Sequence, residues 1–355
     1  MKKLFTVALT ALMVLVLAAC GSEGGSSASG DDGSASGSDS GSKESKTIKA
    51  GIGLNDKHPQ YKGLLKFKEI VEKKTDGQIK VETYHSGQLG DDRTMTENLQ
   101  TGSQEVTIPS TAPLANFVPA FSVFDIPFLF PNTEVADKVL ASETGQGLLK
   151  KLESQNLVGL AYWENGFRDV TNSKRAIKSI EDFEGLKLRT MENDLHLDAF
   201  NKLGANPTPM AFTELFTAMQ QGTVDGQENP YATIYLQKFY EVQKHVSNTH
   251  HIYSPFVFLM SKSFYDNLSD ENKKIVEEAA VEAGKYEKKL NREANEKYLK
   301  KLQEEGMTYT EISEENRKEM KEAVQPVVEK YKSKIGEDVV DNIYKEVEKA
   351  KKETE

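Results

Sequence analysis

Hydrophobic positions from residue 46 onward switch between a period of two and a period near 3.6, which predicts alternating strands and helices. Ile79, Val81 and Thr83 alternate with charged residues, as in a half-buried strand. Further strands are predicted over residues 48–54, 106–109, 157–163, 186–189 and 256–260. Helices are predicted over residues 61–71, 91–100, 135–152 and 194–203, with Asp91 or Asp92 and then Asn193 as N-caps. This order predicts an α/β protein with largely parallel sheets and ligands at the carboxyl ends of strands.

A single long helix is predicted from Asp270 to about Gly306, because this segment has no proline. Its apolar stripe consists of Ile275, Ala279, Ala283, Tyr286, Leu290, Ala294, Tyr298 and Leu302. At 1.5 Å per residue such a helix is about 50 Å long, which exceeds the width of one lobe of about 150 residues. We therefore expect it to run across two lobes. A separate coiled coil is the alternative, which the small residues and irregular heptads disfavour.

Residues 206–244 combine two amphipathic segments with a polar connection. Helical spacing of apolar residues predicts helices over 212–219 and 231–239, and Gly222 ends the first. Asp225-Gly226 predicts a turn. The polar residues after it are Gln227, Glu228 and Asn229. A rigid polar site could be built between two packed helices here, although the spacing alone favours an ordinary helix–turn–helix connection.

The N-terminal residues 1–19 have the pattern of a signal peptide. Lys2 and Lys3 precede an apolar run over 4–19 that is shorter than the roughly 20 residues of a spanning helix. The run ends in Leu-Ala-Ala-Cys, which resembles a bacterial lipobox with Cys20 as the lipidated first residue of the mature protein. A plain secretory peptide is the alternative. Cys20 is the only cysteine, so a disulfide within one chain is excluded.

Residues 20–45 are predicted to form a flexible, lipid-anchored tether. They are mostly Gly, Ser, Asp and Ala, so they bury too little apolar area to offset the entropy of ordering. A coil of this length spans about 25–30 Å, which keeps the folded part near the outer face of the cytoplasmic membrane.

The rest of the chain is long enough for two lobes. The net charge is −10, from 45 basic and 55 acidic residues, which argues against a nucleic-acid partner. The global field does not attract an anion either, so an anion site has to be made by local groups.

The segment PMAFTELFTAMQQGTVDGQENP resembles the signature of the extracytoplasmic solute-binding subunits of TRAP transporters, the DctP family. The same resemblance extends over HSGQLGDDR, VFDIPFLF, NGFRDVTNSKRAI, EDFEGLKLR and FYEVQKH, in order, and covers roughly residues 46–331. It implies a two-lobe periplasmic-binding-protein-like fold whose long C-terminal helix spans both lobes. Lobe I comprises 46–165 with 254–293 returning to it, and lobe II comprises 166–253 with part of 294–355. The implied partners are a small organic acid anion and the TRAP membrane permease, and we expect a monomer without a cofactor.

The resemblance also implies the residues that bind the ligand. Arg189 of the GLKLR motif clamps a substrate carboxylate, for which a planar, permanently charged guanidinium with two parallel donors is well suited. Arg168 reaches the ligand or braces Arg189, Asn229 bonds to the same carboxylate, and Phe212 packs on the ligand.

Asp92 and Ser110 are the implied ligand contacts in lobe I. Asp92 matches a ligand-side acid of sialic-acid-binding relatives, whereas Ser110 replaces a second acid there. Polyhydroxylated acids need acceptors for their hydroxyl groups, and lobe I is expected to lack them. The segment IPSTAPLANFVPAFSVFDIPFLF resembles the dicarboxylate branch. A C4-dicarboxylate is therefore the first choice of ligand, and uronates and other sugar acids stay open.

Enzymatic and metal sites find little support in the sequence. Adjacent His250 and His251 point to opposite sides of an extended chain, and no third metal ligand is suitably spaced. Asp225 and Glu228 form a conceivable acid–base pair, but we expect Glu228 to pair with Arg189. No nucleophile elbow or nucleotide-binding glycine loop is present. A non-catalytic binding protein is expected, with a secreted enzyme acting on organic acids as the alternative. Presentation of the ligand to a sensor kinase is a further option.

Overall fold

The computed structural model describes residues 45–354. The predicted signal peptide, Cys20 and nearly all of the tether lie outside the described residues. The described residues cluster as one compact unit. The boundaries of the two lobes within that unit stay a prediction.

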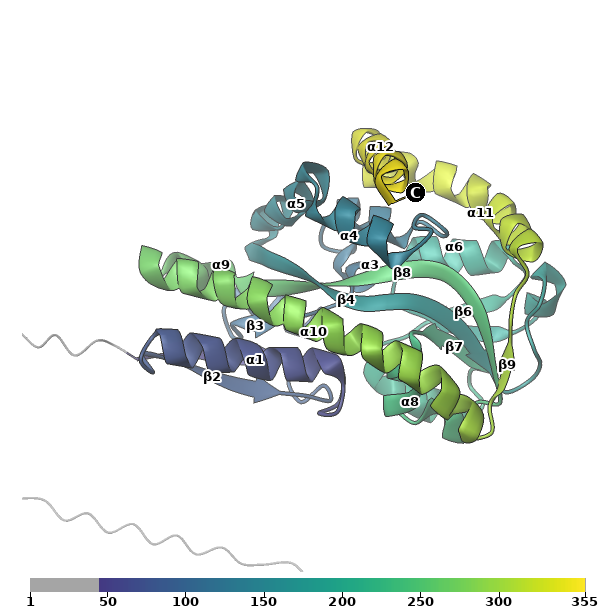
Figure 1. The fold of residues 1–355 in the computed structure, drawn as a ribbon, viewed down its shortest axis with the longest axis horizontal. Coiled ribbons are helices and arrows are strands. Elements are labelled where there is room, and N and C mark those ends of the chain that lie inside the picture. Colours follow the sequence, from purple (N-terminus) through teal and green to yellow (C-terminus); the bar gives the residue numbers. More distant parts are fainter. Residues whose placement is uncertain (1–44, 355) are drawn as a thin grey trace, which may run out of the picture. The chain divides into compact units, whose positions relative to one another are not determined.

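One mixed sheet of nine strands forms the centre of the fold, in the order β2-β1-β3-β8-β4-β7-β5-β6, with β9 added to β8 (Figure 1). The strands are β1 (Lys46–Gly51), β2 (Ile79–Tyr84), β3 (Val106–Thr107), β4 (Leu157–Asn172), β5 (Lys187–Thr190), β6 (Asn206–Pro209), β7 (Gly226–Asn229), β8 (His245–Ser261) and β9 (Thr308–Thr310).

The two flanks of the sheet are parallel, as predicted, but its centre is antiparallel. β1 runs parallel to β2 and β3, and β5 runs parallel to β6 and β7. Between these groups lie β4 and β8, antiparallel strands of 16 and 17 residues. The predicted strands 157–163 and 256–260 are only parts of them. The polar residues that continue β4 beyond Trp163 are buried, so hydrophobic periodicity does not reveal them.

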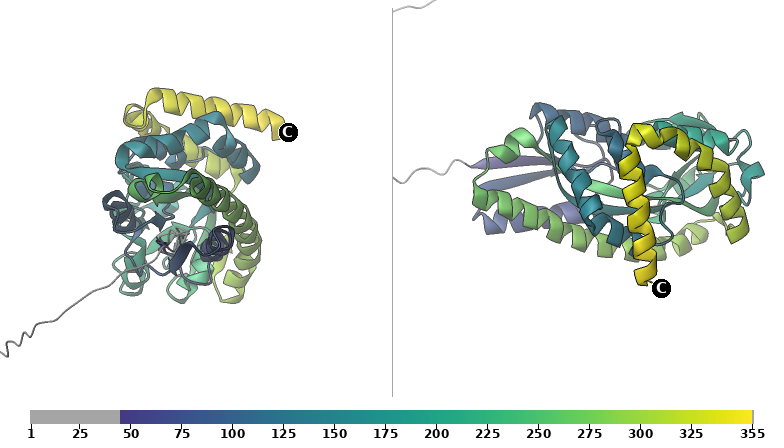
Figure 2. Two further views of the ribbon diagram at one scale, coloured as in Figure 1. Left: turned by 90° about the vertical axis from the view of Figure 1, so that its left-hand side faces the viewer. Right: turned by 90° about the horizontal axis from the view of Figure 1, so that it is seen from above.

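The helices cover both faces of the sheet (Figures 1 and 2). The α-helices are α1 (Pro59–Lys74), α2 (Asp92–Thr101), α3 (Thr111–Leu114), α4 (Thr133–Ala141), α5 (Glu143–Lys150), α6 (Asp194–Lys202), α7 (Leu215–Gln220), α8 (Tyr231–Leu236), α9 (Lys262–Asp266), α10 (Asp270–Glu304), α11 (Glu314–Ile335) and α12 (Glu337–Thr354). The 3₁₀ turns are η1 (Pro119–Asp125), η2 (Lys151–Gln155), η3 (Ile180–Phe183), η4 (Phe212–Glu214) and η5 (Phe239–Glu241).

Several helix ends follow the predicted capping signals. Asp91 and Asn193 are the N-caps of α2 and α6, and Gly102 ends α2 in the left-handed conformation. The single helix predicted over 135–152 is wrong, because Ser142 adopts an extended conformation and accepts a hydrogen bond from the N–H of Gly145. This cap starts α5 as a separate helix.

The polar residues 227–229 lie between α7 and α8 along the chain, as predicted, but they belong to strand β7 inside the sheet. Asp225 does not belong to an isolated turn. Its N–H donates to the carbonyl of Lys187, and its carboxylate accepts from the N–H of Lys187, so it joins β5 to the start of β7. The side chains of β7 are therefore fixed by strand pairing on both sides.

The long helix predicted from Asp270 is confirmed as α10, with 35 residues. Figure 1 shows it running along the molecule from α1 at one end to α8 at the other. Trp163 of β4 packs directly against it, because a Cβ atom on Gly284 would lie only 2.6 Å from the indole ring. The Trp163 indole also donates to the carbonyl of Ala280, at 2.9 Å.

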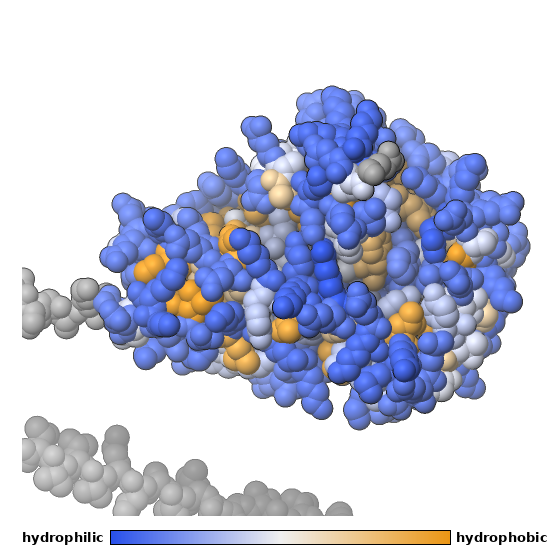
Figure 3. Space-filling model, viewed as in Figure 1, coloured by the Kyte–Doolittle hydropathy of each residue, from blue (hydrophilic) through white to orange (hydrophobic). Residues whose placement is uncertain are grey.

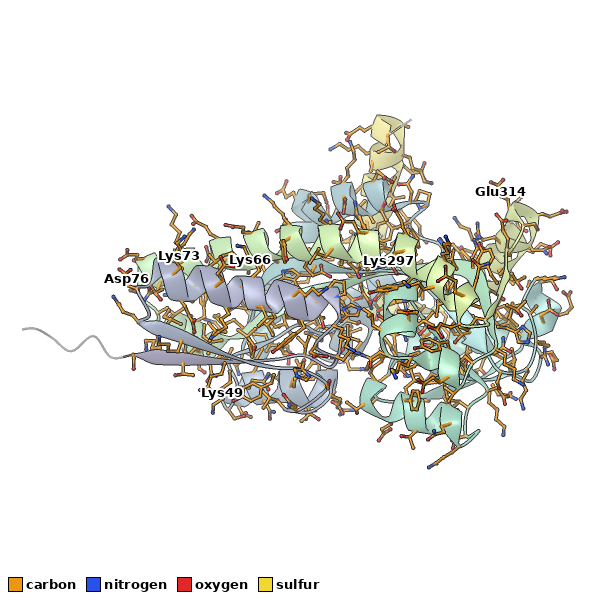
Figure 4. The ribbon with its side chains drawn as sticks, turned by 60° about the horizontal axis from the view of Figure 1, so that its bottom comes forward. Lys49, Lys66, Lys73, Asp76, Lys297 and Glu314 are labelled. Atoms are coloured by element: carbon orange, nitrogen blue, oxygen red, sulfur yellow. The ribbon has the colours of Figure 1, made fainter. Side chains whose placement is uncertain are left out.

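Charged side chains cover the outside of the described unit. Lys73 of α1, Lys297 of α10 and Glu314 of α11 point outward in Figure 4, and Figure 3 shows a mainly hydrophilic surface. Over residues 45–354, no helix combines the length and the apolar character that crossing a bilayer requires.

Candidate functional site

One cavity brings together all six side chains that the sequence predicted for the ligand site. The space open to the centres of water-sized molecules is about 50 Å³, several times the roughly 10–15 Å³ that one water needs. The predicted residues in its lining are Asp92, Ser110, Arg168, Arg189, Phe212 and Asn229. Arg189 and Asn229 lie near the carboxyl ends of β5 and β7, where open α/β sheets bind ligands.

Arg189 is almost fully buried, and the carbonyl of Met210 holds its position. Its Nε and Nη2 donate to that oxygen at 3.0 and 2.6 Å, while Nη1 has no partner among the described residues. Phe212 lies with its ring centroid 6.0 Å from the guanidinium carbon. Burial lowers the pKa of Arg189 to about 10, although Glu228 opposes the shift. Arg189 therefore stays charged at neutral pH, and its Nη1 has hydrogen-bonding capacity to spare.

Glu228 fixes the position of the Arg168 side chain. Its Nε and Nη2 donate to the Glu228 carboxylate, and Nη2 also donates to the Glu228 carbonyl at 2.6 Å. The predicted pair between Glu228 and Arg189 is therefore wrong. β4 and β7 are antiparallel neighbours in which Val170 faces Glu228, and this register brings Arg168 to Glu228. Of the three guanidinium nitrogens of Arg168, only Nη1 lacks a partner among residues 45–354.

A buried histidine completes the support of Glu228. His251 Nε2 lies 3.1 Å from the Glu228 carboxylate, and its Nδ1 lies 2.8 Å from the hydroxyl of Thr249. An ionised Glu228 carboxylate only accepts hydrogen bonds, so Nε2 of the neutral ring donates to it, and Nδ1 then accepts from the Thr249 hydroxyl. Burial raises the pKa of Glu228, but the Arg168 charge outweighs it and holds the pKa below its usual value. Burial lowers the pKa of His251 and keeps the ring neutral.

Carboxylates line the cavity beside the two arginines. Asp92 accepts a hydrogen bond from the N–H of Ser110 at 3.2 Å. The pKa of Asp92 is raised to about 6, mainly by burial and also by Asp91 and Glu192, against the opposite effects of the Ser110 N–H and Arg189. Asp91 and Glu192 also belong to the lining. The expectation that this part of the site lacks acceptors for hydroxyl groups is therefore wrong.

Sequence reasoning missed Asn165, Gln60 and Glu192 as cavity residues. The Asn165 amide lies 3.4 Å from the Ser110 hydroxyl, and its Oδ1 has no partner in the described part of the chain. Asn165 begins the NGFRDVTN motif, but only its arginine was singled out. A useful signal would have been the run of polar residues that follows the apolar start of β4.

His250 and His251 have separate partners. His250 donates its backbone N–H to Asp169, and its Nδ1 also lies 2.8 Å from that carboxylate. Its φ of 45° is left-handed, so the expectation of an extended chain is wrong at this residue. Among the residues that the structure describes, no group of three or more His, Cys, Asp or Glu is arranged to hold a metal ion.

Two solved structures resemble this fold closely. The sugar acid binding protein DctPAm of Advenella mimigardefordensis, in complex with galactonate, is 46% identical with a TM-score of 0.85, covering 86% of this chain and 99% of that one. A TRAP periplasmic solute-binding protein of Polaromonas sp. JS666, bound to D-erythronate, is 41% identical with a TM-score of 0.81, covering 84% and 98%. These matches confirm the predicted mixed α/β periplasmic-binding-protein fold.

The sequence comparisons agree with the structural ones. The C4-dicarboxylate-binding periplasmic protein DctP of Rhodobacter capsulatus is 37% identical over 287 residues, which is 79% of this chain and 85% of that protein. The family model for bacterial extracellular solute-binding proteins, family 7, matches residues 50–334. Members of this family bind solutes and are not enzymes, so the alternative of a secreted enzyme falls away. The chain belongs to the DctP family of bacterial extracellular solute-binding proteins, the binding subunits of TRAP transporters.

Proposed function

We propose that this protein captures a sugar acid with one carboxylate, of the aldonate type, and delivers it to a TRAP membrane permease. The observation that carries the proposal is the mixed charge of the cavity wall. Arg168 and Arg189 each offer one free guanidinium nitrogen, whereas Asp91, Asp92 and Glu192 contribute carboxylates.

The two arginines suit one carboxylate. The Nε and Nη2 atoms of Arg168 bond to Glu228, and the same two atoms of Arg189 bond to the Met210 carbonyl. The two Nη1 groups can each donate to one carboxylate, and the Asn229 side chain lines the same cavity. Charge-assisted hydrogen bonds of this kind are about twice as strong as neutral ones.

The acidic lining suits hydroxyl groups better than a second carboxylate. Ionised carboxylates only accept hydrogen bonds, and hydroxyl groups are able to donate to them. Among the described lining residues, Arg168 and Arg189 are the basic ones. A second carboxylate beside Asp92 would be repelled by up to roughly 4 kcal/mol at 4 Å and an effective dielectric constant of 20.

The ligands of the relatives fit this preference without deciding it. The two similar structures contain galactonate and D-erythronate, which are aldonates. The Rhodobacter capsulatus relative is named for C4-dicarboxylates, the ligand class that the sequence favoured. We propose the aldonate class first because both the wall charges and the more similar structures support it.

Replacing Arg189 tests the proposed function. Arg189→Lys should weaken galactonate binding by about 30-fold or more, because lysine keeps the charge but lacks the planar fork whose separate nitrogens bond Met210 and the proposed ligand. Isothermal titration calorimetry measures the affinity. Arg93→Lys is the matched control, since Arg93 is exposed and pairs with Glu97. Near-normal affinity of Arg189→Lys, with both variants folded, would refute the role of Arg189. Failure of the wild type to bind any aldonate would refute the ligand class.

The pH dependence of binding tests the role of Asp92. Ionised Asp92 accepts from ligand hydroxyls, so galactonate affinity should fall as the pH drops from 7.5 to 5, through the Asp92 pKa of about 6. The ligand carboxyl, with a pKa near 4, stays ionised over this range. Asp92→Asn should remove most of the slope. A dicarboxylate site would show the opposite sign, because protonated Asp92 would donate to the second carboxylate.

We propose that Cys20 carries a lipid that holds the protein at the outer face of the cytoplasmic membrane, since it closes the lipobox-like sequence. In cell fractionation, Cys20→Ala should move the protein from the membrane to the soluble fraction while its melting temperature stays unchanged. Retention of the variant in the membrane fraction would contradict lipidation at this residue.

A further inference from the structure

The main chain of β4 between Glu164 and Gly166 lies between the cavity and the long helix. Pairing with β8 shifts register between Glu164 and Gly166, and Gly166 has a φ of 110°. Pairing with β7 begins only at Asp169. In the described residues, this part of β4 therefore has a free edge, and the irregular backbone does not by itself fix the direction of the Asn165 side chain.

Two buried side chains of α10 occupy that free edge. Glu287 accepts from the N–H of Glu164 at 3.0 Å. Asn291, one turn further on, donates to the carbonyls of Glu164 and Asn165 at 3.0 and 2.9 Å. Glu287 and Asn291 are both fully buried. Their bonds replace the missing strand neighbour, since buried backbone groups have to be paired.

The packing of Trp163 fixes how close the backbone of β4 lies to α10. Trp163, the residue before Glu164, is wedged between helices α1 and α10, where Cβ atoms on Gly63 and Gly284 would each lie 2.6 Å from its ring. The ring and the two polar side chains thus locate the backbone of residues 163–165 relative to α10. Asn165 is the residue of this segment whose side chain lines the cavity.

The Asn165 side chain has hydrogen-bonding capacity to spare. It is 3% exposed, and its one contact is the 3.4 Å approach of Nδ2 to the Ser110 hydroxyl. Its Oδ1 has no partner among the described residues. An amide is able to accept and donate at once, which matches the hydroxyl groups of a sugar acid.

We infer that Asn165 binds a hydroxyl group of the ligand, and that Glu287 and Asn291 are positioning residues that hold it there from the long helix. This inference rests on the proposed sugar-acid ligand. It adds a second hydroxyl-recognising group to Asp92, and it connects the ligand to a helix that also packs on α1 and α8.

A double-mutant cycle on galactonate affinity tests the inference. Asn165→Ala and Asn291→Ala should each weaken binding by about fivefold to tenfold, the loss expected for one hydrogen bond. If Asn291 acts through Asn165, adding Asn291→Ala to Asn165→Ala should change the affinity by less than about twofold. Additive losses would overturn the inference. Asn291→Ser, which keeps a donor, enters the same cycle if the alanine variant does not fold.

Variants of the same helix separate positioning from general stability. Asn295→Ala is the control, because Asn295 bonds the N–H of Ala232 on α8 and not β4. It should lower the melting temperature without changing galactonate affinity. Glu287→Gln keeps an acceptor for Glu164 and should bind normally, whereas Glu287→Leu should bind weakly. Equal affinities for these two Glu287 variants would count against positioning from α10.

If the wild type binds no sugar acid, the proposed function fails first. Suppose that the wild type binds galactonate, that Arg189→Lys does not, and that the losses in the Asn165–Asn291 cycle are additive. The proposed function then stands, and only the inference about Asn165 and α10 fails.

Discussion

The buried pair of Arg168 and Glu228 is the constraint on which the site depends. Both side chains are at most 1% exposed, and taking two charges out of water costs several kcal/mol per ion. The structure offsets this cost with multiple hydrogen bonds, including those to the Glu228 carbonyl and from His251. The same bonds use all but one nitrogen of Arg168, so the pair limits what the cavity is able to bind.

Arg189 is also held by contacts within the protein that leave Nη1 without a partner, but its partner is a backbone carbonyl. The Met210 carbonyl takes its Nε and Nη2, again leaving Nη1. Two pre-positioned nitrogens would lose little side-chain entropy on binding the carboxylate of the proposed ligand. In the same cavity, the carboxylate of Asp92 accepts from the N–H of Ser110. The cavity wall thus carries both cationic and acidic groups, and the proposed ligand, with one charged end and several hydroxyls, complements both.

The sequence predicted those parts of the structure that depend on local signals. The caps at Asp91 and Asn193 and the length of α10 follow from short-range patterns. The cavity residues came from motif resemblance, because nothing in the spacing of Arg168 or Asn229 shows where they meet.

What could not be predicted depends on strand pairing. The partner of Glu228 is set by the register of β7 on β4, and the length of β4 is set by pairing of polar residues with β8. Neither leaves a periodic signal in the chain. Asn165 was missed for the same reason, since its role depends on a helix more than 120 residues away in the sequence.

The account depends most directly on the claim that the cavity accepts one carboxylate and rejects a second. Titration calorimetry at pH 7.5 with galactonate and galactarate tests it, because the two share their hydroxyl chain and differ in the second carboxylate. Repulsion of the second carboxylate by Asp91, Asp92 and Glu192 predicts that galactonate binds at least about tenfold more tightly than galactarate. Equal or tighter binding of galactarate would contradict the account.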